Sequence, residues 1–75
     1  MTKDINVFDV VADIQAKKEQ YRITPSYALF YEIKAELEGI DDGTLYALLD
    51  AQVDSGLLRR RLVVNGLAYE VDAEL

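Results

Sequence analysis

The sequence contains no cysteine, no histidine and no tryptophan, and its 75 residues include a single proline. Without cysteine, no disulfide can stabilise the fold, and no thiolate can attack a substrate or bind a metal ion. Without histidine, the chain lacks the side chain that most often acts as a general base. No phosphate-binding loop or dinucleotide-binding glycine pattern is present either. We therefore expect a protein that is not an enzyme, with no catalytic residue, no metal site and no cofactor.

Long apolar runs are also missing. No stretch approaches the roughly 20 apolar residues of a membrane span, and the N-terminus lacks the basic and apolar regions of a secretory signal. Together with the absence of cysteine, this predicts a cytoplasmic protein with no membrane partner. The chain does have 51% hydrophobic residues. That share favours one folded domain over residues 1–75, with a thin core, because so short a chain buries only about 60% of its unfolded surface.

The net charge is −6, and it is unevenly distributed. The whole acidic excess lies in residues 24–56, where Lys34 is the only basic residue among seven acidic ones. An acidic surface repels the phosphate backbone of nucleic acid at long range. Nucleic acid is therefore disfavoured as a partner, although it stays an open alternative.

The segment from Asp4 to Glu19 has the periodicity of a first helix. Its firmly polar positions form one narrow stripe, and apolar residues occupy most of the remaining circumference. A helix with this much apolar surface is better explained by a core on one side and a partner on the other. We predict a homodimer, and the residues expected to form the contact are Val7, Val10, Val11 and Ile14.

Two further helices are predicted after a short extended link at Tyr21–Ile23. Thr24 and Pro25 form a helix start signal, an N-cap followed by a proline at the first helical position, and Gly39 is the matching stop. The third helix follows a tight break. Asp41 or Asp42 can cap it, and Gly56 ends it. Its expected buried stripe consists of Leu45, Leu48, Leu49 and Val53.

A β-hairpin is predicted over Leu57–Val64 and Leu67–Val71. The Asn65-Gly66 pair between the strands is the strongest short hairpin signal. A two-residue turn there sets the register, with Leu62 opposite Tyr69. The same register places Arg59 opposite Asp72 and Arg61 opposite Glu70, so that opposite charges meet across the strands.

The expected fold is mainly α with a β-hairpin, in the order helix, short strand, helix, turn, helix and two-stranded wing, which is a winged helix. The segments YEIKAELEGI at 31–40, GTLY at 43–46 and SGLLR at 55–59 resemble the PadR-type transcriptional regulators. The resemblance covers about half of the chain and continues loosely to Tyr69. It implies that the helix starting near Thr44 enters the DNA major groove and that the wing touches phosphate. The implied DNA contacts are Thr44, Arg59, Arg60 and Arg61.

The residues leave the role of these positions open. The side chains that would face the groove include two acids, Asp50 and Asp54, and no base, whereas base readers and phosphate clamps are typically Arg, Lys, Asn or Gln. Arg59 and Arg61 have a simpler use as cross-strand ion-pair partners. Arg60 would then lie along the edge of the core.

Tyr27 and Tyr31 are four residues apart in the predicted second helix. They are either an ordinary side-chain pair on that helix or anchors of a protein interface, where tyrosine is enriched. The leading hypothesis is a non-catalytic winged-helix interaction module that self-associates and binds an unknown protein partner. The alternative is a small DNA-binding transcriptional regulator that uses the wing arginines.

Overall fold

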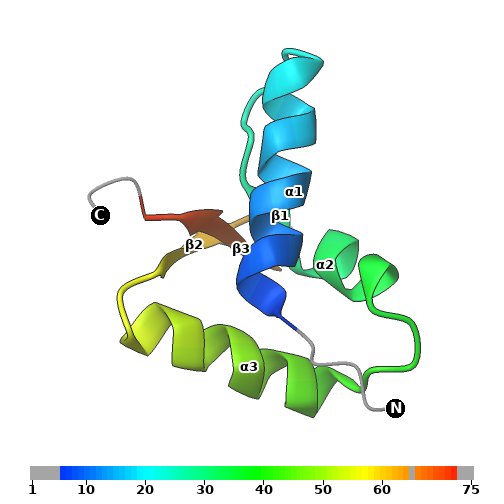
Figure 1. The fold of residues 1–75 in the computed structure, drawn as a ribbon, viewed down its shortest axis with the longest axis vertical. Coiled ribbons are helices and arrows are strands. Elements are labelled where there is room, and N and C mark those ends of the chain that lie inside the picture. The colour runs from blue at the N-terminus through cyan, green and yellow to red at the C-terminus, as the bar shows by residue number, and fades with distance from the viewer. Residues whose placement is uncertain (1–5, 65, 73–75) are drawn as a thin grey trace.

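The computed structural model describes residues 6–64 and 66–72, which form three helices and a three-stranded antiparallel sheet. The elements in chain order are α1 (Val7–Gln20), β1 (Ala28–Leu29), α2 (Phe30–Glu36), α3 (Asp42–Asp54), β2 (Leu58–Val63) and β3 (Gly66–Val71). The strands are arranged in the order β1-β3-β2. Figure 1 shows α1 standing upright over α3, with α2 on one side and the β2–β3 hairpin on the other. The expected combination of helices with a C-terminal hairpin is confirmed.

The first helix begins where Asn6 caps it. The Asn6 side chain accepts a hydrogen bond from the backbone N–H of Asp9 at 3.3 Å, which satisfies one of the free donors at the helix start. The helix ends at Gln20, one residue beyond the prediction, and Lys17 and Lys18 in its last turn suit the negative end of the helix dipole. The predicted start at Asp4 lies outside the described residues.

The connection between α1 and α2 differs from the prediction. Tyr21 and Arg22 form a turn in place of an extended link, and the Thr24–Pro25 pair does not start a helix. The short strand is Ala28–Leu29, because Ala28 pairs with Tyr69 of β3 and so keeps this backbone extended. The second helix can therefore begin only at Phe30. The pairing with β3, which is remote in sequence, outweighs the local start signal.

The third helix follows the prediction closely. Asp41 is its N-cap and accepts hydrogen bonds from the N–H of Thr44 at 3.0 Å and from the Thr44 hydroxyl at 2.8 Å. Gly56 follows the helix end with a φ of +84°, a left-handed conformation that favours glycine. Of the predicted buried stripe, Leu45 and Leu49 are fully buried. Leu48 and Val53 are partly buried and pack against the core.

The register of the hairpin is shifted by two residues from the prediction. Leu62 pairs with Leu67 instead of Tyr69, and Gly66 lies inside β3 opposite Val63. A shift of two keeps every side chain on its expected face. It also brings Leu58 opposite Val71, and Leu58 is only 2% exposed. Burial of this leucine at the start of β2 explains why the observed register is preferred to the one that a turn at Asn65-Gly66 would set.

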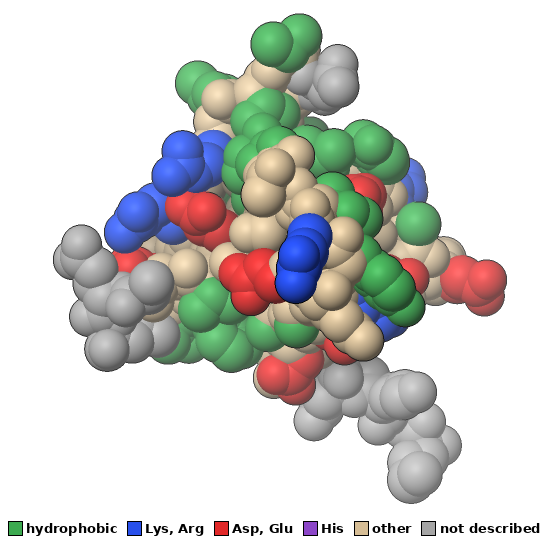
Figure 2. All heavy atoms as spheres, turned by 90° about the horizontal axis from the view of Figure 1, so that it is seen from above, with side chains coloured by type: hydrophobic (Ala, Val, Ile, Leu, Met, Phe, Trp, Pro, Cys, Tyr) green, Lys and Arg blue, Asp and Glu red, His purple; other side chains and the backbone are tan. Residues whose placement is uncertain are grey.

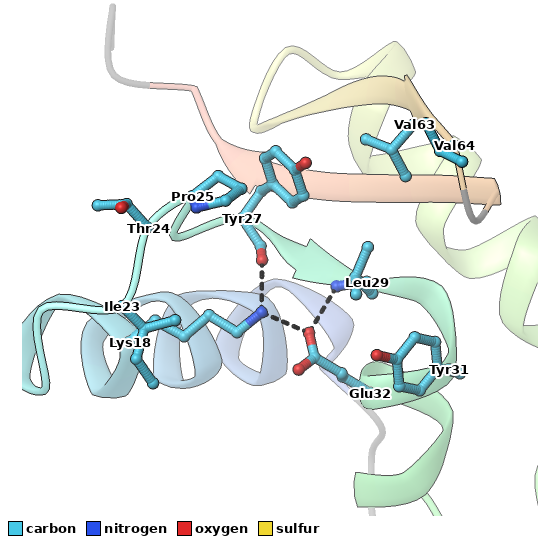
Figure 3. Close-up of a pocket in the computed structure, with 10 residues that line it drawn as sticks. All are labelled: Lys18, Ile23, Thr24, Pro25, Tyr27, Leu29, Tyr31, Glu32, Val63 and Val64. Atoms are coloured by element: carbon cyan, nitrogen blue, oxygen red, sulfur yellow. Dashed lines mark hydrogen bonds and ion pairs between the residues drawn. The ribbon is translucent and has the colours of Figure 1, made fainter.

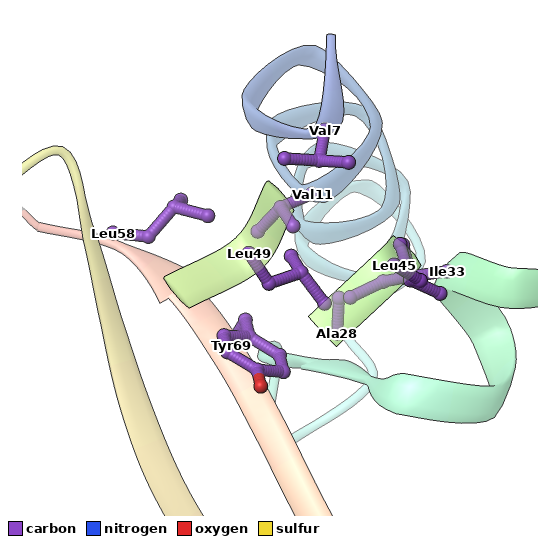
Figure 4. Close-up of a cluster of buried hydrophobic side chains, with 8 residues drawn as sticks. All are labelled: Val7, Val11, Ala28, Ile33, Leu45, Leu49, Leu58 and Tyr69. Atoms are coloured by element: carbon purple, nitrogen blue, oxygen red, sulfur yellow. The ribbon is translucent and has the colours of Figure 1, made fainter. Parts of the chain in front are cut away.

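One core joins all six elements, as Figure 4 shows. Its buried members are Val7, Val11, Ala28, Ile33, Leu45, Leu49, Leu58 and Tyr69. Full burial of an aliphatic side chain of this kind stabilises the fold by about 1.5–3 kcal/mol. A polar contact adds to this packing, because the Gln15 side chain of α1 accepts a hydrogen bond from the N–H of Val71 at 2.9 Å. The helix α1 is thereby held against β3.

Candidate protein interface

A partly buried ion pair connects α1, β1 and α2. The Lys18 ammonium donates to the Glu32 carboxylate at 2.7 Å and to the backbone oxygen of Tyr27 at 3.0 Å. The same Glu32 oxygen accepts the N–H of Leu29 at 2.9 Å (Figure 3). The Lys18 and Glu32 side chains are only 15% and 28% exposed. The pair therefore occupies the N–H of Leu29 in the edge strand β1 and the backbone oxygen of Tyr27 just before it, two groups that an added strand would need.

A hollow of about 450 Å³ lies beside this ion pair. Its lining residues, drawn in Figure 3, are Lys18, Ile23, Thr24, Pro25, Tyr27, Leu29, Tyr31, Glu32, Val63 and Val64. Most of these side chains are apolar or aromatic, and Lys18 and Glu32 are the only charged ones. At the rim, Tyr31 is 61% exposed, Ile23 is 50% exposed and Val64 is fully exposed. Large apolar side chains are thus gathered at the surface around one hollow, which is typical of an interaction site.

The two tyrosines predicted as interface candidates both line this hollow. Their secondary structure differs from the prediction, because Tyr27 precedes β1 and only Tyr31 lies in a helix. They are therefore not an i, i+4 pair on one helical face. The same surface also includes Ile23, Val63 and Val64, which were not predicted from the sequence. The apolar run before Asn65 was the only sequence feature that marked the two valines, and no local pattern connects that run to Ile23.

Each arginine of the β2–β3 hairpin, which is the predicted wing, has a carboxylate partner. Arg59 pairs with Asp72 at 3.2 Å, and Arg61 pairs with Glu70 at 2.9 Å, as the charge pattern predicted. The partners were predicted to lie directly opposite each other. They lie diagonally across the strands instead, since the register places Arg59 opposite Glu70. Figure 2 shows basic side chains lying close to acidic ones on the face that it presents. The wing therefore lacks the row of unpaired cations that phosphate binding requires.

Arg60 lies opposite the buried Tyr69 of β3, and its guanidinium extends to Asp50 of α3 at 2.7 Å, a partner that was not predicted. Both side chains are about half exposed, so water screens this pair and it adds at most about 1 kcal/mol. Its main effect is geometric, because it ties the wing strand β2 to α3.

The outward face of α3 carries no basic side chain in the described helix. Thr44 is exposed, but its hydroxyl donates to Asp41, and its N–H is bonded to the same carboxylate. These two donors hold the pKa of Asp41 below its ordinary value. The exposed positions further along this face are Ala47, Ala51 and Asp54. A phosphate backbone that approached this face would meet negative charge.

The apolar residues of α1 predicted to form a dimer contact are largely used by the domain itself. Val7 is 2% exposed and Val11 is fully buried, so the structure corrects their role from surface to core. Val10 and Ile14 are half-buried and pack against the same core. The helix is apolar around much of its circumference because the sheet and both other helices contact it.

None of the described helices is long and apolar enough to cross a bilayer. Comparison of the chain with protein-family models, with curated proteins and with solved structures finds no match.

Proposed function

We propose that this chain is a non-catalytic winged-helix interaction module that acts by binding protein through the hollow beside β1. The winged-helix assignment is supported by the element order, which is helix, short strand, two helices and a two-stranded hairpin. The connection between α2 and α3 is short, as a helix-turn-helix needs. A cytoplasmic location remains a prediction of the sequence alone.

The observation that carries the proposal is the contrast between the hollow and the wing. The charges of the wing arginines are matched by carboxylates of the same chain. The hollow instead leaves Tyr31, Ile23 and Val64 at the surface with at least half of their area in water. Burial of apolar area drives protein association, and tyrosine is enriched where proteins meet. The side chains at the hollow have surface left to bury, whereas those of the wing already have partners.

A photo-cross-linking amino acid placed at Tyr31 tests this proposal in cells of the source organism. Benzoylphenylalanine at Ala47, on the exposed outward face of α3, is the matched control. We expect discrete protein adducts from position 31 and none from position 47. Adducts that form equally at both positions, or at neither, would contradict binding through the hollow.

The alternative function is a small DNA-binding transcriptional regulator that uses the wing arginines. The resemblance of the GTLY and SGLLR segments to PadR-type regulators favours it. It requires Arg59, Arg60 and Arg61 to exchange their carboxylate partners for phosphate. Titration of the chain with duplex DNA at low salt measures this directly, and electrostatic binding would weaken steeply as the salt concentration rises.

A further inference from the structure

We propose that the partner bound at the hollow is a second copy of this chain, in a two-fold symmetric contact. This inference rests on the proposed function and names the occupant of the same surface. In such a dimer one patch meets its own copy, so a residue that projects from the patch must find a recess in that same patch.

The patch has both parts of such a contact. Val64 projects at the rim and is fully exposed. The recess beside it is formed by Tyr27, Leu29 and Tyr31, and Figure 3 shows Val63 and Val64 on the side of the hollow across from Tyr31. A two-fold axis through the rim would place the Val64 side chain of each copy in the hollow of the other. The same surface then supplies the projecting group and its pocket.

The charge distribution also favours a second copy at this surface. Two chains of net charge −6 repel each other over most approaches. At the hollow the only charged lining residues, Lys18 and Glu32, are bonded to each other at 2.7 Å. The patch therefore presents apolar surface with no net charge, so two copies meet there with little like-charge repulsion. A basic partner would instead be attracted to the acidic residues outside the hollow, which lie between positions 36 and 54.

The ion pair further defines the kind of contact. Because Lys18 holds the backbone oxygen of Tyr27 and Glu32 holds the N–H of Leu29, a partner strand cannot pair with these groups at the edge of β1. The contact must form by insertion of side chains. Three large side chains, Ile23, Tyr31 and Val64, are exposed at the rim, so the interface falls in the small, weak class, below about 1,200 Å² of buried surface.

Sedimentation equilibrium of the full chain tests the inference at concentrations from about 10 μM to about 1 mM, which covers weak interfaces of this size. The informative variant is Val64→Asp. The matched control is Leu62→Asp, which adds the same charge two residues away, at a side chain that is 86% exposed and does not line the hollow. Neither change removes a core contact, and circular dichroism would verify that both variants are folded.

We expect a concentration-dependent dimer for the unmodified chain. Val64→Asp should raise its dissociation constant at least about tenfold, because each dimer contains the change twice and buries a carboxylate in an apolar hollow. Leu62→Asp should change it by about twofold or less. A monomer at every concentration, or equal effects of the two variants, would overturn the second copy as the occupant. Adducts to other proteins from position 31 would then leave the proposed function standing, whereas their absence would remove both.

Discussion

Replacement of Glu32 by alanine should cost this small domain a large part of its stability. The change removes the acceptor of the Leu29 N–H and the partner of the Lys18 ammonium. A partly buried donor that loses its acceptor costs about 1–3 kcal/mol, and a hydrogen bond to a charged group contributes about 1.5–3 kcal/mol. Water replaces part of this, since the Lys18 and Glu32 side chains are 15% and 28% exposed. We expect a net loss of about 2 kcal/mol of unfolding free energy.

Urea and thermal unfolding followed by circular dichroism measure this loss. For a domain of this length, about 2 kcal/mol corresponds to a fall of about 10 °C in the unfolding midpoint. Glu32→Gln is the diagnostic second variant, because an amide oxygen can still accept from Leu29 and Lys18. We expect it to lose only about 1 kcal/mol. The exposed pair of Asp13 with Lys17 on α1 gives the control, and Asp13→Ala should leave the midpoint nearly unchanged.

A Glu32→Ala variant as stable as Asp13→Ala would contradict this role of Glu32. It would mean that water replaces the carboxylate as the partner of Leu29 and Lys18 at no cost in stability. Equal losses for Glu32→Ala and Glu32→Gln would locate the stabilisation in the charge alone. The graded order of the three variants is therefore what the structure predicts.

Three further measurements probe other parts of the fold. Burial raises the pKa of the Tyr69 hydroxyl, which has the Arg60 guanidinium as a neighbour but makes no well-aligned hydrogen bond within the described residues. Tyr69→Phe should therefore change the unfolding free energy in urea by no more than about 1 kcal/mol; a larger loss would show that Arg60 donates to the hydroxyl. Asp41→Ala should destabilise the fold at pH 7 through loss of the α3 cap. Because the folded pKa of Asp41 lies below its ordinary 3.8, its contribution is present above that pH and is lost as the pH falls through the folded value, so the two melting curves should converge in acid. Gly56→Ala places a side chain at a φ of +84° and should cost about 1 kcal/mol, measured by the same unfolding.

The sequence predicted best those elements whose signals are local. Asp41 and Gly56 bound the third helix, and both act on groups within one turn, so the residue types alone identified them. The second helix was predicted five residues too early, because the pairing of Ala28 with Tyr69 joins positions 41 residues apart in the chain. The register of the hairpin was predicted wrongly for the same reason. The turn signal is local, whereas the burial of Leu58 depends on the completed core.

The candidate site was predicted only in fragments. Tyr27 and Tyr31 were singled out by residue type, and the structure brings them to one surface. Their neighbours Val63 and Val64 come from the other end of the chain, so their place at the hollow follows from the strand order β1-β3-β2. The first helix shows the opposite case. Its apolar excess was assigned to a core on one side and a partner on the other, whereas the sheet and both other helices of the same domain contact it.

The ion pairs of the three hairpin arginines also affect the position of the hollow. Arg59 pairs with Asp72 just after β3, Arg61 pairs with Glu70 within β3, and Arg60 pairs with Asp50 of α3. The first two pairs join the strands of the hairpin to each other, and the third joins the hairpin to α3. The pairs therefore help to hold Val63, at the end of β2, and Val64, which follows it, beside the hollow. The carboxylates that pair with the arginines thus also help to position the surface that we propose for protein binding. Asp50→Ala, which frees Arg60, should therefore weaken the self-association measured by sedimentation as well as expose a cation.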